Sequence, residues 1–178
     1  MQFNSKKIDI SKYIVYIIFV LCLIIFGIWL KGSFFSLSNL LNITRQAGAV
    51  SVMAIGMVFV IGLGHIDLSI GSVVALSSLI TAYILRDTGN PVLAVIVAIG
   101  FGAIVGLFNG LCVTIIGMPA FLTTLGSQAI LTGIAMWISA TKAVPITHKG
   151  FLFWFGSGTI GQVPILLFWA VGATVVGY

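Results

Sequence analysis

The chain has 178 residues, of which 60% are hydrophobic and only 6% are charged. A soluble domain carries about 25% charged residues, so this composition excludes a water-soluble globular protein and predicts an integral membrane protein. The formal charge of +5 does not predict nucleic-acid binding. The basic residues lie at the N-terminus and at the edges of apolar runs rather than in a patch.

Apolar runs of about a helix length follow one another along the chain, without the alternation that is typical of barrel strands. Since about 20 helical residues cross a bilayer, we predict an all-α, polytopic membrane helix bundle with about five to six spans in one transmembrane domain, residues 1–178. The expected spans cover about 13–30, 47–64, 68–85, 92–116, 121–138 and 163–178. The last run is short for a crossing and predicts a domain that is incomplete at its C-terminus.

The first apolar run follows Lys6, Lys7 and Lys12. It is longer than a signal-peptide core, and no small-residue cleavage site follows it, so we expect a retained span with a cytoplasmic N-terminus. If every run then crosses fully, the later basic residues lie outside, which opposes the positive-inside tendency. Either the orientation is reversed or some runs re-enter. The next stretch, "FFSLSNLLNITRQ", predicts an interfacial turn and a short helix before the second span.

The stretch "GLGHIDLSIGS", beginning at Gly62, places a carboxyl group between two apolar runs. At mid-bilayer such a group costs roughly 2.5–3.5 kcal/mol. Asp67 can be the N-cap of the third helix, with Ser69 supporting the free N–H groups. It can also mark a broken helix on a conduction pathway, where glycines such as Gly64 interrupt apolar segments. Both interpretations predict a helix break near 62–69. His65 has no nearby ligand pair, so no metal site is expected.

The stretch "GMPAFLTTLGS" predicts a second helix break near 117–121, because glycine and proline interrupt helices. Pro119 is expected to end the fourth helix, and Phe121 to begin the fifth span. Thr123 and Thr124 follow, where their hydroxyls can bond backbone groups. The segment is either a cytoplasmic turn or a second break that faces the first across a pore.

Three glycines, Gly102, Gly106 and Gly110, recur every four residues in the fourth span. They share one helix face, and small residues of this kind let two helices approach closely. Helix packing is the expected role, with a substrate-facing groove as the alternative. Asn109 lies beside this stripe. An amide at that depth needs a partner, so it is expected to clamp two helices or to line the substrate path.

No signature of catalysis is present. The sequence has no phosphate-binding loop, no Glu, and no Cys–His or Ser–His pair in a supporting context. Cys22 and Cys112 lie within apolar runs, where small core residues are expected rather than a disulfide or a metal site. We therefore expect a protein that is not an enzyme and that holds no cofactor.

Two segments contain the polar motif around Asp67 and the two predicted helix breaks in order: "ITRQAGAVSVMAIGMVFVIGLGHIDLSIGSVVAL" and "GLFNGLCVTIIGMPAFLTTLGSQAILTGIAMWIS". With the later "VPILLF", they resemble the permease subunits of bacterial ABC sugar importers of the ribose, xylose and galactose type. The resemblance covers nearly all of this chain but only about the first half of a family member. It implies a multi-pass subunit of the bacterial inner membrane that forms the translocation path for a monosaccharide.

The resemblance also implies partners. These are a second permease copy, cytoplasmic ABC ATPase subunits that hydrolyse the ATP, and an extracytoplasmic sugar-binding protein. Family members usually carry a Gly-Gly pair before "IDLS", where this chain has Gly64 and His65. The family's ATPase-docking loop follows the sixth span, so a chain that stops at Tyr178 is expected to lack it.

Two other classes of function stay open on the sequence. An ion- or proton-coupled secondary transporter would use Asp67 as its coupling group, although no second intramembrane acid accompanies it. A non-transport membrane scaffold would show no substrate-dependent phenotype on deletion. The order of the motifs favours the importer over both.

Overall fold

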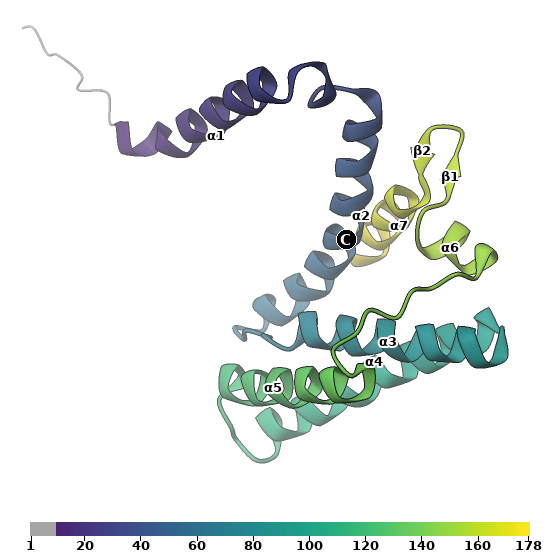
Figure 1. Cartoon of the computed structure of the whole chain (residues 1–178). Helices are drawn as coiled ribbons and strands as arrows, with labels where there is room; N and C mark the ends of the chain where they lie inside the picture. The colour runs from purple at the N-terminus through teal and green to yellow at the C-terminus, as the bar shows by residue number, and fades with distance from the viewer. Residues whose placement is uncertain (1–9) are drawn as a thin grey trace, which may run out of the picture. The chain divides into compact units, whose positions relative to one another are not determined.

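The computed structural model describes residues 10–178, so Lys6 and Lys7, on which the predicted orientation depends, lie outside the described residues. The chain divides into two compact units, Met1–Thr44 and Arg45–Tyr178, and each is described by itself. The described elements are helices except for one short strand pair (Figure 1). The helical class predicted from the apolar runs is therefore confirmed.

The first unit contains α1 (Ile10–Trp29), the 3₁₀ turn η1 (Lys31–Ser33) and the start of α2 (Leu37–Gly62). Phenylalanine rings hold the turn after α1. The ring of Phe26 stacks on Phe34 with centroids 5.9 Å apart. Gly27 leaves room for Phe35, since a Cβ at Gly27 would lie 2.9 Å from that ring.

α2 is a single helix of 26 residues, whereas the sequence predicted a separate short helix and a span that begins near residue 47. The reason is local. No glycine or proline interrupts residues 37–46, and hydrogen bonds of serine and threonine side chains to the backbone support the first turns of the helix. Ser36 Oγ accepts from the Asn39 N–H at 3.3 Å, and the Thr44 hydroxyl donates to the Leu40 carbonyl at 2.9 Å.

The second unit is built around three helices, α3 (Ile70–Thr88), α4 (Pro91–Thr114) and α5 (Ala120–Ser139). α3 packs against both α4 and α5, which also touch each other. Leu76, Val105 and Leu131 form the buried centre, one from each helix. Burying such side chains among one another gives close packing, on which helix association in a membrane depends.

Gly89 and Asn90 make a tight turn between α3 and α4. Gly89 closes α3 in the left-handed conformation, with φ 65°, and its N–H bonds the Leu85 carbonyl. Asn90 caps α4, because its Oδ1 accepts from the N–H groups of Val92 and Leu93 at 3.0 and 3.1 Å. Pro91 follows at a position where its missing N–H costs nothing.

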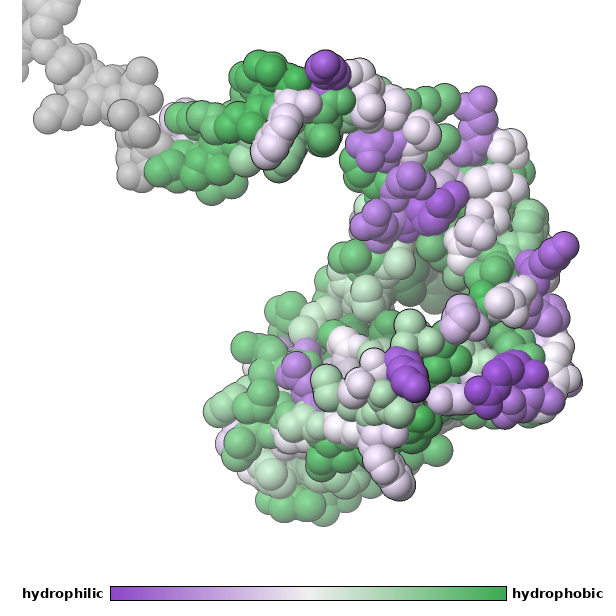
Figure 2. All heavy atoms as spheres, viewed as in Figure 1, coloured by the Kyte–Doolittle hydropathy of each residue, from purple (hydrophilic) through white to green (hydrophobic). Residues whose placement is uncertain are grey.

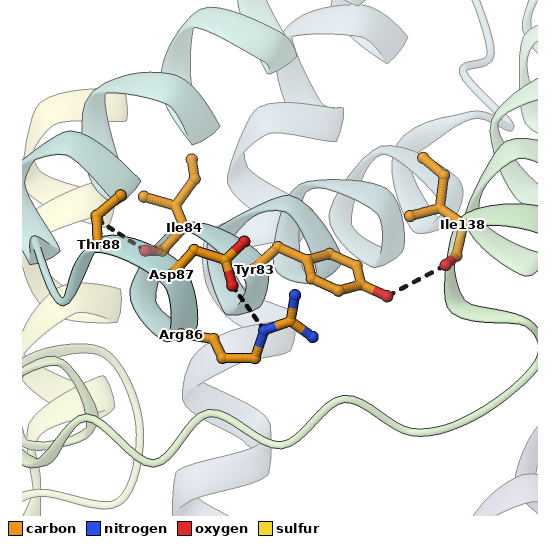
Figure 3. A network of polar contacts seen from close by, with 6 residues as sticks. All are labelled: Tyr83, Ile84, Arg86, Asp87, Thr88 and Ile138. Atoms are coloured by element: carbon orange, nitrogen blue, oxygen red, sulfur yellow. Dashed lines mark hydrogen bonds and ion pairs between the residues drawn. The ribbon is translucent and has the colours of Figure 1, made fainter.

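The same end of α3 is tied to the end of α5 (Figure 3). The Tyr83 hydroxyl donates to the Ile138 carbonyl at 3.1 Å. Arg86 lies over the Tyr83 ring, 4.5 Å from its centroid, and pairs with Asp87 at 2.7 Å. Both charged side chains are exposed, as expected at the end of a helix that crosses a membrane.

The connection after α5 contains short elements of regular structure. It forms α6 (Lys149–Phe155) and a two-residue pairing of β1 (Thr159–Ile160) with β2 (Val163–Pro164), followed by α7 (Ile165–Gly177). Trp169 joins α7 to α6, since its Nε1 donates to the Trp154 carbonyl at 2.8 Å and its ring stacks on Phe155 at 5.5 Å.

Four of the described helices, α2, α3, α4 and α5, are long and apolar enough to cross a membrane, and Tyr13–Trp29 and Ile165–Gly177 are shorter apolar helices. Large hydrophobic side chains of these helices are exposed within the chain. Figure 2 shows them covering much of the visible face over α3, α4 and α5. Such a surface is stable against lipid rather than water.

We predict that Gly48→Val destabilises the contact between α2 and α7. A Cβ at Gly48 would lie 2.9 Å from the backbone oxygen of Leu166, and overpacking of this kind costs about 1–3 kcal/mol. The free energy of unfolding in mixed detergent micelles measures the effect. Gly56→Val in the same helix is the matched control, because a Cβ there meets no described atom within 4 Å. Equal losses in the two variants would contradict the prediction.

Candidate functional site: two helix breaks joined by a buried polar network

The first break separates α2 from α3 and occupies residues 63–69. Gly64 makes the turn with φ 78°, a backbone conformation that residues other than glycine rarely adopt. The His65 N–H donates back to the Val60 carbonyl at 3.1 Å. The chain then runs without helix to Ser69, and α3 begins at Ile70. A helix break near 62–69 is therefore present.

Asp67 organises the start of α3, but not as its N-cap. Its Oδ1 accepts from the Ser69 N–H at 2.7 Å and from the Ser69 hydroxyl at 2.6 Å. Ser69 is the N-cap residue, and its side chain makes no capping bond to the helix. The expected position of the cap was therefore wrong by two residues. Asp67 instead forms a local turn of the kind that Asp side chains favour just before a helix.

The second break separates α4 from α5. α4 ends at Thr114, and Gly117 turns the chain with φ 77°. Pro119 is the N-cap residue of α5, so it precedes the fifth helix rather than ending the fourth. The Thr123 hydroxyl donates to the Pro119 carbonyl at 3.3 Å, which is the backbone bond predicted for that side chain.

Thr124 joins the two breaks directly. Its Oγ1 accepts from the Leu68 N–H at 3.0 Å and lies 3.3 Å from the Ile66 carbonyl oxygen, to which it can donate. Oγ1 also lies 3.0 Å from the Ala120 carbonyl oxygen of its own helix. The side chain is 3% exposed. One hydroxyl therefore satisfies the irregular backbone of the first break from the first turn of α5.

Asn109 joins all three helices of the bundle. The Ser127 hydroxyl of α5 donates to Asn109 Oδ1 at 2.5 Å, and Asn109 Nδ2 donates to Ser69 Oγ at 3.1 Å. Because Ser69 in turn donates to Asp67, the bonds form one directed chain from α5 through α4 to the first break. The helix clamp expected of this amide is present, and its partners are buried.

The network stabilises the backbone of the two helix breaks and is not suited to catalysis. Ser69 is 1% exposed, and Asn109 and Ser127 are 6% exposed, so their polar groups would cost free energy without partners. Among the described residues, no group of three or more His, Cys, Asp or Glu could hold a metal ion. The arrangement fixes two interrupted helices against each other, and non-helical backbone at membrane depth requires such support.

Other predicted residues stay outside the network. His65 is exposed, and Phe121 is 55% exposed. A Cβ added to Gly102, Gly106 or Gly110 would meet no described atom within 4 Å. The close helix approach predicted for this stripe is therefore not made inside the described part of the chain, and it stays a prediction for contacts beyond it.

Sequence reasoning missed Ser127 and Ser72. Ser127 lies three residues after Thr124, so the two hydroxyls share one face of α5, and that spacing was the available signal. Ser72 donates to the Ser69 carbonyl at 2.7 Å, which supports the first turn of α3. Its hydroxyl makes a bond so local that nothing distinguishes it from an ordinary helical serine.

We predict that Thr124→Val loosens the two breaks. Valine keeps the shape but leaves the Leu68 N–H without its acceptor, at a cost of about 1–2 kcal/mol in the free energy of unfolding. Thr123→Val is the matched control, since the Thr123 hydroxyl bonds only the Pro119 carbonyl at the N-cap of the same helix. Hydrogen exchange of the Leu68 amide gives a second measurement and should rise in Thr124→Val alone. Unchanged exchange at Leu68 would contradict the prediction.

Sequence comparison shows which known proteins this chain is similar to. Residues 39–177 match the family model described as branched-chain amino acid transport system / permease component. The ribose import permease protein RbsC of Escherichia coli K12 is 36% identical, and the match covers 80% of this chain and 45% of the relative. The xylose transport system permease protein XylH of Haemophilus influenzae is 30% identical, and the match covers 99% of this chain and 47% of the relative.

The galactofuranose transporter permease protein YtfT of Escherichia coli K12 is 33% identical, and the match covers 72% of this chain and 40% of the relative. The chain thus spans less than half the length of each of these three relatives. No solved structure matches it.

Proposed function

This chain belongs to the branched-chain amino acid transport system / permease component family, and from that membership we propose that it forms part of the translocation path of an ATP-driven importer for a monosaccharide such as ribose, xylose or galactose. Members of such a family are membrane transport subunits of the inner membrane and are not themselves enzymes. ATP hydrolysis would take place on a separate subunit.

The observation that carries the proposal is the agreement among the relatives. The family is described by the transport of branched-chain amino acids, yet the three relatives above are named for ribose, xylose and galactofuranose. A further relative, at 31% identity, is a D-allose permease protein. All four names refer to sugars, which are neutral compounds with several hydroxyl groups. This agreement favours a sugar over an amino acid as the substrate class.

The same membership supports the partners and topology that we propose. The partners are cytoplasmic ABC ATPase subunits, an extracytoplasmic sugar-binding protein and a second permease copy. With the shorter helices α1 and α7 counted as crossings or parts of crossings, the four long helices become about five to six spans in one permease domain. The N-terminus is proposed to be cytoplasmic.

The two breaks are proposed to shape the path. Gly64, His65, Asp67 and Ser69 form one wall segment, and Pro119, Phe121 and Thr123 the other. Asn109 holds them in register. Exposed His65 and Phe121 are the members with side chains free to meet a substrate. Asp67 is already bonded to Ser69, which supports a structural role and weakens the ion-coupled alternative.

Uptake measurements in the native host test the proposal. Deletion of the gene is expected to abolish uptake of at least one radiolabelled pentose or hexose supplied at micromolar concentration, and a plasmid copy should restore it. Addition of an ionophore that collapses the proton gradient, with ATP maintained, should leave uptake intact. Unchanged uptake of every sugar tried would contradict the proposal. Loss of uptake with the ionophore alone would favour the ion-coupled transporter.

A further inference from the structure

A cavity of about 360 Å³ lies between α3, α4 and the segment that leads through α6. Its residues belong to none of the groups assigned to the two breaks. The volume falls in the range of about 300–1,000 Å³ that small-molecule sites occupy. All its walls belong to the second unit of the chain, in which α3, α4 and α6 are labelled in Figure 1.

One wall of the cavity contains a hydroxyl that makes no hydrogen bond within the described part of the chain. Thr81 lines the cavity and is 4% exposed. Within the described residues, its hydroxyl makes no hydrogen bond. Helical threonines elsewhere behave differently, since Thr88 and Thr114 donate to the carbonyl four residues before them. The Thr81 hydroxyl is not among the fully inaccessible polar atoms of the described residues, so a molecule in the cavity can reach it and form a hydrogen bond with it.

Two serines extend the same wall. Ser77 and Ser78 also line the cavity, and no hydrogen bond to either is found among the described residues. They precede Thr81 by four and three residues, so the three hydroxyls share one face of α3. Each hydroxyl can donate once and accept twice. Together they form a polar wall that suits a ligand with several hydroxyl groups of its own.

The other walls are apolar and uncharged. Val95, Ala98 and Ile99 come from α4, while Phe151 and Phe155 come from α6 with ring centroids 5.0 Å apart. No Lys, Arg, Asp or Glu lines the cavity. A charged ligand would lose its hydration there without a counter-charge. The ligand that fits is neutral, with one polar edge and one apolar face.

We propose that this cavity binds a monosaccharide, with sugar hydroxyls bonded to Ser77, Ser78 and Thr81 and the C–H face of the ring against Phe151 and Phe155. The choice of a sugar over other neutral polyols rests on the proposed function. A lipid acyl chain fits the walls less well, because it would leave all three hydroxyls without partners.

Cysteine protection tests the proposal on the full chain in lipid nanodiscs. The thiol introduced by Ser78→Cys, in a background with Cys22→Ser and Cys112→Ala, is labelled with N-ethylmaleimide. D-Ribose, D-xylose, D-galactose and D-fructose are each added at 1–50 mM. At least one sugar is expected to slow labelling threefold or more. The thiol introduced by Thr114→Cys, outside the cavity, should react at the same rate with and without sugar.

Two further substitutions separate binding from folding. Thr81→Val keeps the shape and should raise the half-protecting concentration about fivefold, the equivalent of one lost hydrogen bond. Thr81→Ser should restore it. Ala98→Trp fills the cavity and should abolish protection. No protection by any of the four sugars, or protection that survives both Thr81→Val and Ala98→Trp, overturns the proposal.

The outcomes also distinguish this cavity from the transport function on which it rests. Sugar uptake that depends on the chain, together with no protection at Ser78→Cys, overturns the cavity and leaves the transport function standing. Protection by a sugar, with uptake of that sugar unaffected by deletion, supports the cavity and contradicts the transport function.

Discussion

Asn109→Leu is expected to lower the free energy of unfolding by about 2 kcal/mol, because it removes two hydrogen bonds at once inside the bundle. Leucine has the same number of side-chain heavy atoms as asparagine in the same branched arrangement, so the substitution opens no cavity and the loss measures chiefly the bonds. The Ser127 hydroxyl loses its acceptor and Ser69 Oγ loses a donor. The measurement is detergent unfolding of the purified chain, followed by helical circular dichroism.

A double-mutant cycle with Ser127→Ala identifies the cause. If the Ser127 to Asn109 bond carries the effect, the double variant should lose less unfolding free energy than the sum of the two single losses. The difference should be about 0.5–1.5 kcal/mol, since each single variant already breaks the same bond. Ser139→Ala is a matched control in the same helix, because the Ser139 hydroxyl contacts only the Met136 carbonyl of α5. Additive losses for Asn109→Leu and Ser127→Ala would contradict the clamp.

The parts of the fold that the sequence predicted are those decided by local chemistry. Apolar runs without alternation indicate membrane helices, and the breaks near Gly64 and Gly117 follow from glycines that adopt positive φ. The turn at Gly89 and Asn90 is local in the same way. The features that the sequence did not predict depend on neighbouring elements or on small differences in conformational free energy. The two-residue strand pair depends on neighbours, because propensity is weak where tertiary contacts decide. The continuous α2 depends on a small difference of this kind, because its polar residues favour a turn but no glycine or proline interrupts the helix there.

The candidate site divides along the same line. The need of Asn109 for a partner could be predicted, because a buried amide is costly in any fold. Its actual partners could not, since Ser69 and Ser127 lie 40 and 18 residues away in the sequence and only the packing of three helices brings them together. Thr124 likewise looked like a helix-start residue. Its bond to the Leu68 N–H spans 56 residues.

The carboxyl group of Asp67 gives the second large effect. Asp67→Ala removes both bonds to Ser69 and is expected to cost about 2 kcal/mol of unfolding free energy. Asp67→Asn keeps an oxygen that can accept the same two bonds and should cost no more than about 1 kcal/mol, the difference between a charge-assisted and a neutral bond. Detergent unfolding of the two variants beside the parent chain measures the difference.

The same pair of variants decides between a structural and an ion-coupling role. If Asp67 only holds the start of α3, sugar uptake in Asp67→Asn should stay within a few-fold of the parent, while Asp67→Ala loses uptake in proportion to its lost stability. A coupling carboxyl gives the opposite order, since an amide cannot exchange a proton and Asn would fail as completely as Ala. Abolished uptake with retained sugar binding in Asp67→Asn would therefore contradict the structural role, because the turn to Ser69 that it preserves is the contact on which that role depends.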